Sequence, residues 1–300
     1  MNRISPLLAT YRKLHKQTQR DLVNELLQYS KNFKGLNTVT LSRWETSTTT
    51  PSFNKKRLLL HFFANSQCFT SDTTSYNIVN EAYKSLYEPL RTIFSREYQY
   101  LIGNLPEHRT GQHTIENLKN FSQKEEHIEH IIDIETATNA TNYYNLTPSL
   151  LKQWCTFSST FCIVAERKKQ HLGHFIMLKL KNHVAEEIAH NKRSEFDLSK
   201  NDFCNVDEHG TYYIHGLYGR SPKIAAELNV KAYLHLFKHM NTIDNLMIFS
   251  SRTDGMLLTQ DYGIKEVAHG VDEEYEFEWH GMLSPIEDIL FSDTVVKLIF

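Results

Sequence analysis

Apolar residues recur at helical spacing in four short runs near the start of the chain. Thr18 stands before the second run and Asn37 before the third, and both residue types commonly cap helices. Pro51 precedes the fourth run, as prolines often do at a helix start. The pattern predicts a small all-α domain over residues 1–65, with helices around residues 4–11, 22–27, 39–44 and 58–63.

A second helical pattern follows a polar stretch at residues 65–75, which is rich in Ser and Thr and has the composition of a linker. An apolar face then runs from Val79 to Leu101, and Pro89 within it predicts a kink or two helices. We interpret residues 66–125 as a linker and helical connector.

From about residue 128 the pattern changes to short runs rich in β-branched and aromatic residues. A helical run at residues 224–240 separates the last two runs, and residues 274–279 have the character of an edge strand or hairpin arm. This order predicts an α/β or α+β domain over residues 126–300. The expected strands lie at residues 130–134, 161–165, 175–180, 212–217 and 246–249.

Charge is distributed unevenly between the predicted domains. Residues 1–64 contain eleven Lys or Arg and three acidic residues, a net charge of +8, whereas the rest of the chain carries −10. A basic head on an acidic body indicates that the head binds a polyanion. Small domains without such a partner can also carry uneven charge, so the charge alone leaves that alternative open.

The four cysteines are scattered and form no CxxC pair, so we expect reduced thiols in a cytoplasmic protein and no zinc site. The N-terminus lacks the apolar core of a signal peptide, and no stretch is long and apolar enough to span a bilayer. We therefore expect no membrane partner.

Acidic residues and histidines cluster at residues 125–130, where His127 and His130 are spaced one helical turn apart. Metal ligation is one interpretation, but a solvated helix face or the beginning of a strand is the more common one. His171 and His174 flank two residues that we interpret as a turn between strands. We predict no metal site.

Residues 37–45 read Asn-Thr-Val-Thr-Leu-Ser-Arg-Trp-Glu, and Thr-Pro-Ser follows at residues 50–52. Upstream, Thr18 and Gln19 stand before an apolar run. In this order the motifs resemble the Cro/C1-type (XRE) helix-turn-helix family over most of residues 3–63. The segment at 28–36 is longer than the usual turn of that family, and is either a surface insertion or an added phosphate contact.

The resemblance implies that residues 38–45 form a recognition helix. Its exposed side chains would read base edges in the major groove, where an arginine can bind guanine through two hydrogen bonds. A homodimer on a palindromic double-stranded site is the natural arrangement for so short a helix. We expect Glu45 to form an internal salt bridge. The expected DNA-contacting residues are Gln19, Lys34, Thr38, Thr40, Ser42 and Arg43.

A further group of motifs lies in the C-terminal half. Tyr-Tyr-Ile-His-Gly-Leu at 212–217 precedes Arg-Ser-Pro-Lys-Ile-Ala at 220–225, and Tyr-Gly-Ile-Lys-Glu-Val stands at 262–267. These motifs resemble the GNAT acyltransferase family over about residues 128–282, although Lys223 replaces the first glycine of that family's phosphate loop. The resemblance implies an acyl-CoA site with contacts from Leu217, Arg220, Lys223, Ile224 and Ala225.

The catalytic groups of that family are not matched. Thr259 stands where many members have a tyrosine that protonates the departing thiolate, and the expected central strand lacks a well-placed carboxylate. His215 and Tyr262 are the remaining candidates for a base and an acid. The more ordinary interpretations are a hydrogen-bonded strand histidine for His215 and a packing residue for Tyr262.

From the sequence we hypothesise a cytoplasmic, sequence-specific DNA-binding transcriptional regulator that requires no cofactor. Its GNAT-like domain would sense a small molecule, such as an acyl-CoA, or a protein partner; the unmatched catalytic groups argue against an enzyme but leave that question open. One alternative is an active N-acyltransferase with a DNA- or protein-binding head. Another is a phage-type repressor or antitoxin.

Overall fold

The computed structural model describes residues 4–67, 80–96, 112–139 and 144–300. The chain divides into two compact units: unit 1 comprises Met1–Leu86 and Phe291–Phe300, and unit 2 comprises Tyr87–Leu290. Residues 68–75 of the expected polar linker lie outside the described residues. Leu101, the expected end of the apolar face that follows, also lies outside them. In the part of the chain that is described, no helix combines the length and apolarity needed to cross a bilayer.

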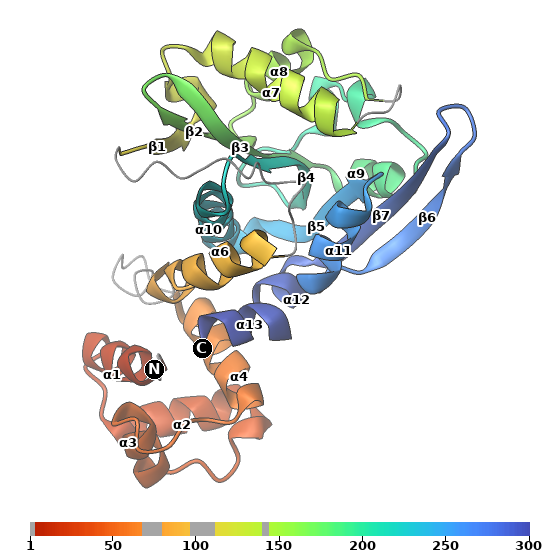
Figure 1. Ribbon diagram of the computed structural model, residues 1–300. Coiled ribbons are helices and arrows are strands. Elements are labelled where there is room, and N and C mark those ends of the chain that lie inside the picture. The colour runs from red at the N-terminus through yellow and green to blue at the C-terminus, as the bar shows by residue number, and fades with distance from the viewer. Residues whose placement is uncertain (1–3, 68–79, 97–111, 140–143) are drawn as a thin grey trace. The chain divides into compact units, whose positions relative to one another are not determined.

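Unit 1 is all-α, as predicted. α3 contacts both α1 and α2 (Figure 1), and its Leu41 and Trp44 are buried in the core that these helices share. Val39 of the same helix is 58% exposed and lies outside this core. The elements are α1 (Ile4–Leu14), α2 (Gln19–Tyr29), the 3-10 helix η1 (Lys31–Phe33), α3 (Thr38–Glu45), α4 (Phe53–Gln67) and, from the C-terminus, α13 (Asp293–Ile299).

Both predicted N-caps form. The Thr18 hydroxyl accepts a hydrogen bond from the Asp21 N–H at 3.2 Å, and the Asp21 carboxylate accepts one from the Thr18 N–H at 2.9 Å. The Asn37 side chain accepts from the Thr40 N–H at 2.8 Å. These bonds satisfy N–H groups that the first helical turn leaves without partners, and they fix where α2 and α3 begin.

The long segment between α2 and α3 is anchored in the core of unit 1. Phe33 is fully buried and Leu36 nearly so, whereas Lys31 and Lys34 are exposed. The segment therefore has a packed apolar side and a basic side that faces solvent.

The C-terminal helix α13 completes unit 1 by packing against α4 (Figure 1). The Lys297 ammonium lies 5.5 Å from the centre of the Phe53 ring, and Arg57 pairs with Asp293 at 3.6 Å. The sequence pattern at residues 1–65 gave no indication that the end of the chain joins this domain.

Unit 2 contains a seven-stranded mixed sheet in the order β1-β2-β3-β4-β5-β7-β6. Only β4 and β5 are parallel, and every other neighbouring pair is antiparallel. The strands are β1 (Thr114–Asn117), β2 (Phe161–Arg167), β3 (Gln170–Leu180), β4 (Gly210–Gly219), β5 (Ile243–Ser250), β6 (Glu266–Asp272) and β7 (Phe277–Pro285).

Helices cover both faces of this sheet (Figure 1), which confirms an α/β architecture. α7, α8 and α9 share one hydrophobic core with β2, β3 and β4, whereas α10 packs on the other face beside α6. The sequence predicted a kink or two helices at Pro89. Two helical segments form, but the break lies at residues 85–86, and Pro89 lies in the first turn of α6. The helices are α6 (Tyr87–Arg96), α7 (Lys124–Asn139), α8 (Pro148–Trp154), α9 (Asn182–Ala189), α10 (Pro222–Lys238), α11 (Thr253–Asp261) and α12 (Ile286–Leu290).

Two local predictions for unit 2 are wrong. Residues 130–134, expected as a strand, belong to α7, because burial of Ile128, Ile131 and Glu135 follows helical spacing. His171 and His174 lie within β3 and do not flank a turn. The turn comes earlier, at residues 168–169, which adopt positive φ angles of 50° and 69°.

Candidate functional site

The parallel strands β4 and β5 diverge at a bulge in β4. Against β3, Ile214 faces Met177 and Gly216 faces Ile176, so His215 is the extra residue. The β4–β5 ladder ends at the pair Ile214 and Ile248. A bulge bends its strand and ends regular pairing, which opens the sheet beyond this point.

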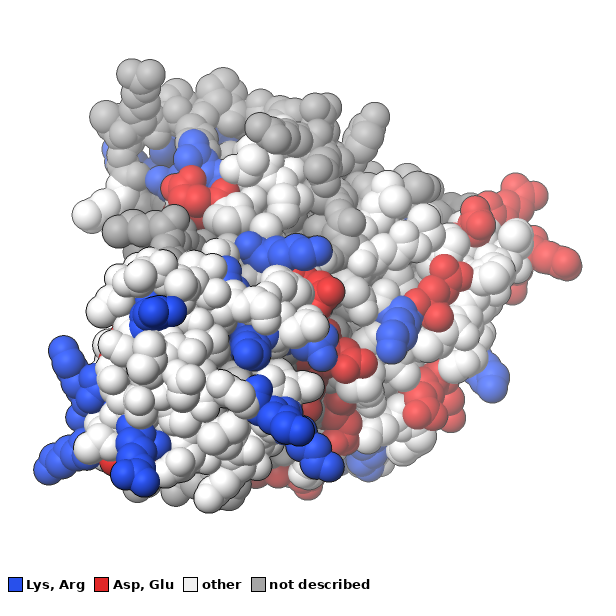
Figure 2. Space-filling model, turned by 90° about the horizontal axis from the view of Figure 1, so that it is seen from below, with Lys and Arg blue, Asp and Glu red and all other residues white. Residues whose placement is uncertain are grey.

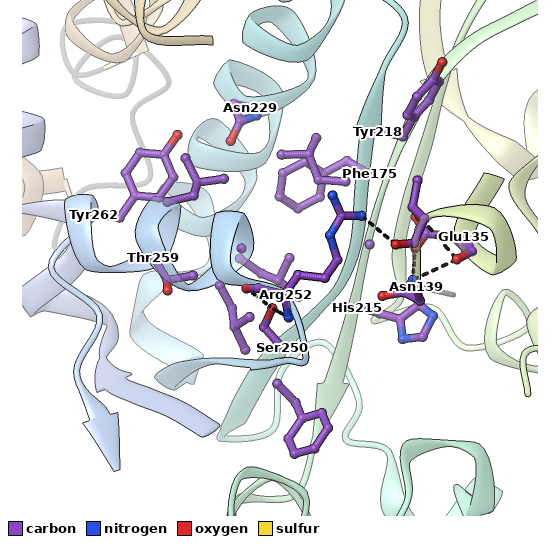
Figure 3. A pocket seen from close by; sticks show the side chains of 18 residues that line it. Glu135, Asn139, Phe175, His215, Tyr218, Asn229, Ser250, Arg252, Thr259 and Tyr262 are labelled. Carbon is purple, nitrogen blue, oxygen red and sulfur yellow. Dashed lines mark hydrogen bonds between the residues drawn. The ribbon is translucent and has the colours of Figure 1, made fainter. Parts of the chain in front are cut away.

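A cavity of about 120 Å³ lies in this opening (Figure 3). Residues 214–218 of β4 and 248–250 of β5 form two of its walls. α7 and α11 contribute further residues, and Asn229 comes from α10. Ligands commonly bind where two parallel strands separate, because side chains and main-chain groups converge there without filling the space.

Glu135 brings a carboxylate from α7 to this cavity. Its Oε1 lies 2.7 Å from His174 Nε2. Asn139 Nδ2 donates to its Oε2 at 3.3 Å (Figure 3). A Cβ atom at residue 216 would lie 2.5 Å from Glu135 Oε1, so glycine at that position leaves room for the carboxylate against β4.

Glu135 is 5% exposed, yet its pKa lies below the ordinary value. Burial opposes ionisation, but the hydrogen bond with His174 and the charges of His174, His215 and Arg252 outweigh it. The cavity therefore contains an ionised carboxylate. The expected central strand lacks a carboxylate of its own, and this one comes from a helix 81 positions earlier than Gly216 in the chain.

His215, one of the two catalytic candidates, lines the same cavity. Its Nε2 lies 3.1 Å from the Tyr144 hydroxyl, while its Nδ1 is buried with no hydrogen-bonding partner among the described residues. Burial lowers the pKa of His215 to about 4, against the opposing effect of the Glu135 charge. His215 is therefore a neutral imidazole near pH 7.

The α11 wall contains the other candidate, Tyr262 (Figure 3). Thr259, one turn earlier, is buried, and its hydroxyl donates to the Met256 carbonyl at 2.7 Å. Arg252, at the start of α11, donates to the Thr138 carbonyl at 3.2 Å and thereby links this wall to α7. Arg252, Thr259 and Tyr262 thus all line this side of the cavity, and the Thr259 hydroxyl is already bonded within α11.

The expected phosphate loop forms the beginning of α10. Ser221 is its N-cap and accepts from the Ile224 N–H at 3.4 Å, while Pro222, in the first turn, has no N–H to offer. Ile224 and Ala225 are buried, and Arg220 and Lys223 are half-buried. The main chain therefore presents few donors here, and an anion would depend on the two basic side chains. Leu217, the fifth expected contact, lines the cavity.

In unit 1, Glu45 forms the internal salt bridge that the sequence predicted. Arg12 Nε donates to it at 2.9 Å, and its side chain is 7% exposed. Gln19 also donates to Glu45, at 2.8 Å, so its amide group is held inside the unit.

The surface of α3 combines an apolar side chain with polar ones. Thr38, Val39 and Arg43 are exposed, whereas Thr40 and Ser42 are half-buried. Over residues 4–64, seven Lys or Arg side chains are exposed and one acid, Asp21. Figure 2, a view from below, shows basic side chains spread over this unit. The exposed bases are Lys13, Lys16, Arg20, Lys31, Lys34, Arg43 and Arg57.

Within the described residues, no group of three or more His, Cys, Asp or Glu side chains is arranged to hold a metal ion. His127, expected on a solvated helix face, is instead 1% exposed, while His130 is exposed as expected.

No known family matches the sequence, and no curated protein is significantly similar to it. Several solved structures resemble the C-terminal part of the chain. An N-acyl amino acid synthase from uncultured soil microbes is 10% identical over 59% of this chain and 92% of its own, with a TM-score of 0.42. An N-acetyltransferase from Staphylococcus aureus Mu50 is 12% identical over 58% and 99%, with a TM-score of 0.38. The ribosomal-protein-S18-alanine N-acetyltransferase from Escherichia coli is 8% identical over 58% and 94%, with a TM-score of 0.37. Similarity at this level bears on the fold alone, and the function has to come from the cavity.

Proposed function

We propose that unit 2 binds an acyl-CoA between β4 and β5 and transfers its acyl group to an amine. One observation carries this proposal: an ionised, buried carboxylate, Glu135, lies against the bulged strand where the two parallel strands separate. Such a carboxylate can attract an ammonium ion and accept one of its protons, which prepares the amine for attack on a thioester.

The reaction forms a C–N bond and breaks the C–S bond of the thioester. Glu135 removes a proton from the amine, which attacks the carbonyl carbon. Main-chain N–H groups of β4 beyond its ladder with β5 can stabilise the negative oxygen that develops. Tyr262, on the α11 wall, supplies a phenol that can protonate the departing thiolate.

His215 lines the same cavity, with its Nε2 3.1 Å from the Tyr144 hydroxyl. As a neutral imidazole it accepts or donates a hydrogen bond without placing a second positive charge beside the ammonium. Arg220 and Lys223, at the beginning of α10, are the side chains that would bind the CoA phosphates.

Turnover of acetyl-CoA and longer acyl-CoAs with a panel of primary amines tests this function in the full chain. We expect Glu135→Gln to lower kcat/KM by about 100-fold or more, since general bases contribute about 100- to 10,000-fold, and to leave CoA binding unchanged. CoA binding without turnover in the wild type would contradict acyl transfer and favour the sensing role. No CoA binding at all would exclude both.

The exposed face of α3 favours a second function, sequence-specific DNA binding by unit 1 as a dimer on a palindromic site. Arg43 is exposed and bonded to no described side chain through its guanidinium, and over residues 4–64 seven basic side chains are exposed against one acidic side chain. Together with acyl-CoA binding, this would make the protein a transcriptional regulator that responds to acyl-CoA.

A mobility-shift assay on a selected site tests this role. Arg43→Ala should weaken specific binding by roughly 1–3 kcal/mol, the value of one bidentate contact to guanine. Lys34→Ala is the matched control: loss of a phosphate contact should weaken specific and non-specific binding alike. Unchanged specific binding in Arg43→Ala would exclude α3 as the recognition helix.

A further inference from the structure

A continuous row of hydrogen-bonded histidines leads away from Glu135. His174 Nε2 lies 2.7 Å from Glu135 Oε1, and His174 Nδ1 lies 3.1 Å from His171 Nε2. His171 Nδ1 lies 3.2 Å from His127 Nδ1, and His127 Nε2 lies 2.9 Å from Glu166 Oε2. Three imidazole rings thus join two carboxylates without a gap.

Every ring nitrogen of His127, His171 and His174 takes part in this row, which makes the number of protons countable. Each of the four contacts needs one hydrogen, and an ionised carboxylate can only accept. Three neutral imidazoles carry only three N–H groups. With both carboxylates ionised, one of the rings must therefore carry an extra proton.

The extra proton belongs on an outer ring. Burial, followed by the charges of His174, His127 and His130, lowers the pKa of His171 to about 2, so the middle ring is neutral. The proton then lies on His127 beside Glu166 or on His174 beside Glu135. These two arrangements differ in the tautomer of His171, and transfer along the existing hydrogen bonds converts one into the other.

The two ends of the row differ in their access to solvent. The side chains of His174 and Glu135 are 0% and 6% exposed, whereas that of Glu166 is 18% exposed. Two further titratable rings among the described residues lie beside the row. The ring centre of His130 is 5.9 Å from that of His171, and the ring centre of Tyr218 is 5.9 Å from that of His174. His215, Arg252 and Tyr144 face the Glu135 end. The row connects the buried Glu135 and His174 side chains to the more exposed Glu166.

Acyl transfer to an ammonium ion leaves one proton to dispose of. The ammonium brings three hydrogens, of which the amide retains one, the free thiol takes one, and one must leave the cavity. We infer that His174, His171 and His127 couple Glu135 to solvent at Glu166: when Glu135 takes a proton from the amine, the extra proton of the row passes from His174 through His171 to His127, and His127 releases one proton through Glu166 to water. This inference rests on the acyl transfer proposed above, which supplies the proton.

Removal of the middle ring tests the relay by activity. His171→Ala should lower kcat about tenfold or more, the lower range for loss of a proton-transfer group, with little change in KM, and added imidazole should restore much of the loss. His130→Ala is the matched control, because this exposed ring adjoins His171 but is not part of the row. Full activity in His171→Ala, or a loss that imidazole does not repair, would overturn the relay.

Nitrogen-15 NMR of the ring nitrogens tests the relay without any turnover. At neutral pH we expect His171 to be neutral and one proton charge to be shared between His127 and His174. Glu166→Gln, which removes the outer carboxylate charge, should shift that charge toward His174. A charged His171, or a His174 that does not respond to Glu166→Gln, would overturn the relay even if acyl transfer is found. If the NMR response is as expected but the protein turns over no acyl-CoA, the result would contradict acyl transfer and leave the relay standing.

Discussion

Each unit of this protein contains a buried glutamate with a lowered pKa, and the two differ in their partners. Burial opposes ionisation of Glu45, but bonds from Arg12 and Gln19 overcome that effect. Glu135 is ionised through His174. A guanidinium does not release its proton in proteins, whereas an imidazole does so near neutral pH. The same residue type is therefore a fixed structural ion in unit 1 and a group capable of proton transfer in unit 2.

Neutralising each glutamate in turn gives the largest expected contrast. Glu45→Gln should lower the free energy of unfolding of unit 1 by about 2 kcal/mol, less than the 3–5 kcal/mol typical of a fully buried pair, because Arg12 is 24% exposed. Acyl transfer should be unaffected. Glu135→Gln should instead abolish acyl transfer and leave the stability of unit 1 unchanged.

Denaturant titration and steady-state kinetics on both variants test this contrast. A loss of acyl transfer in Glu45→Gln comparable to that in Glu135→Gln would contradict the separation of roles. Arg12→Lys provides a further control, since it retains the charge but not the forked geometry.

The second largest expected difference between the units is the pH at which each loses stability in acid. His215, with its pKa lowered to about 4, stays neutral while the unfolded chain binds a proton near pH 6.5. The unfolded state then holds more protons, so unit 2 loses stability as the pH falls from about 6.5 to about 4. The carboxylate Glu45 has a pKa lowered from 4.5, so its contribution to unit 1 is lost only below that value. Amide hydrogen exchange in each unit against pH measures this order, and a common midpoint would contradict it.

The smallest expected effect concerns Val39 on the exposed face of α3. Val39→Ala should raise the stability of unit 1 by up to about 0.5 kcal/mol, because alanine favours helix more than valine does, and Val39 buries little. Specific DNA affinity should nevertheless fall if its methyl groups contact a thymine methyl. Thermal melts measure the stability of the variant, and mobility shifts measure its DNA binding. A Val39→Ala variant that binds DNA more weakly only because it is less stable would contradict a contact between Val39 and DNA.

The helices of unit 1 were predictable because their signals are local. A cap acts on an N–H group three residues away, as in Thr18 and Asp21, and an apolar face repeats every three or four residues. Packing of α13 on α4 was not predictable, since Lys297 and Phe53 share no local pattern.

In unit 2 the sequence predicted most of the strands and the helix α10. The predictions for three histidines were wrong: His127 is buried, and His171 and His174 lie within β3. Residues 130–134 formed too short an apolar run to distinguish strand from helix. Burial of His127 depends on the ring of Phe121 and on β2, neither of which its spacing reveals.

The sequence by itself determined the helical head, its caps and its charge, because each depends on neighbouring residues or on composition; it indicated a salt bridge for Glu45, but only folding brings Arg12 to it across 33 positions. The candidate site was decided only by the tertiary structure. Register between β2 and β3 places Glu166 opposite His171, and α7 then brings Glu135 to His174 across 39 positions of sequence. A carboxylate acquires its proton affinity from the groups packed around it, and in unit 2 those groups come from segments that only folding brings together.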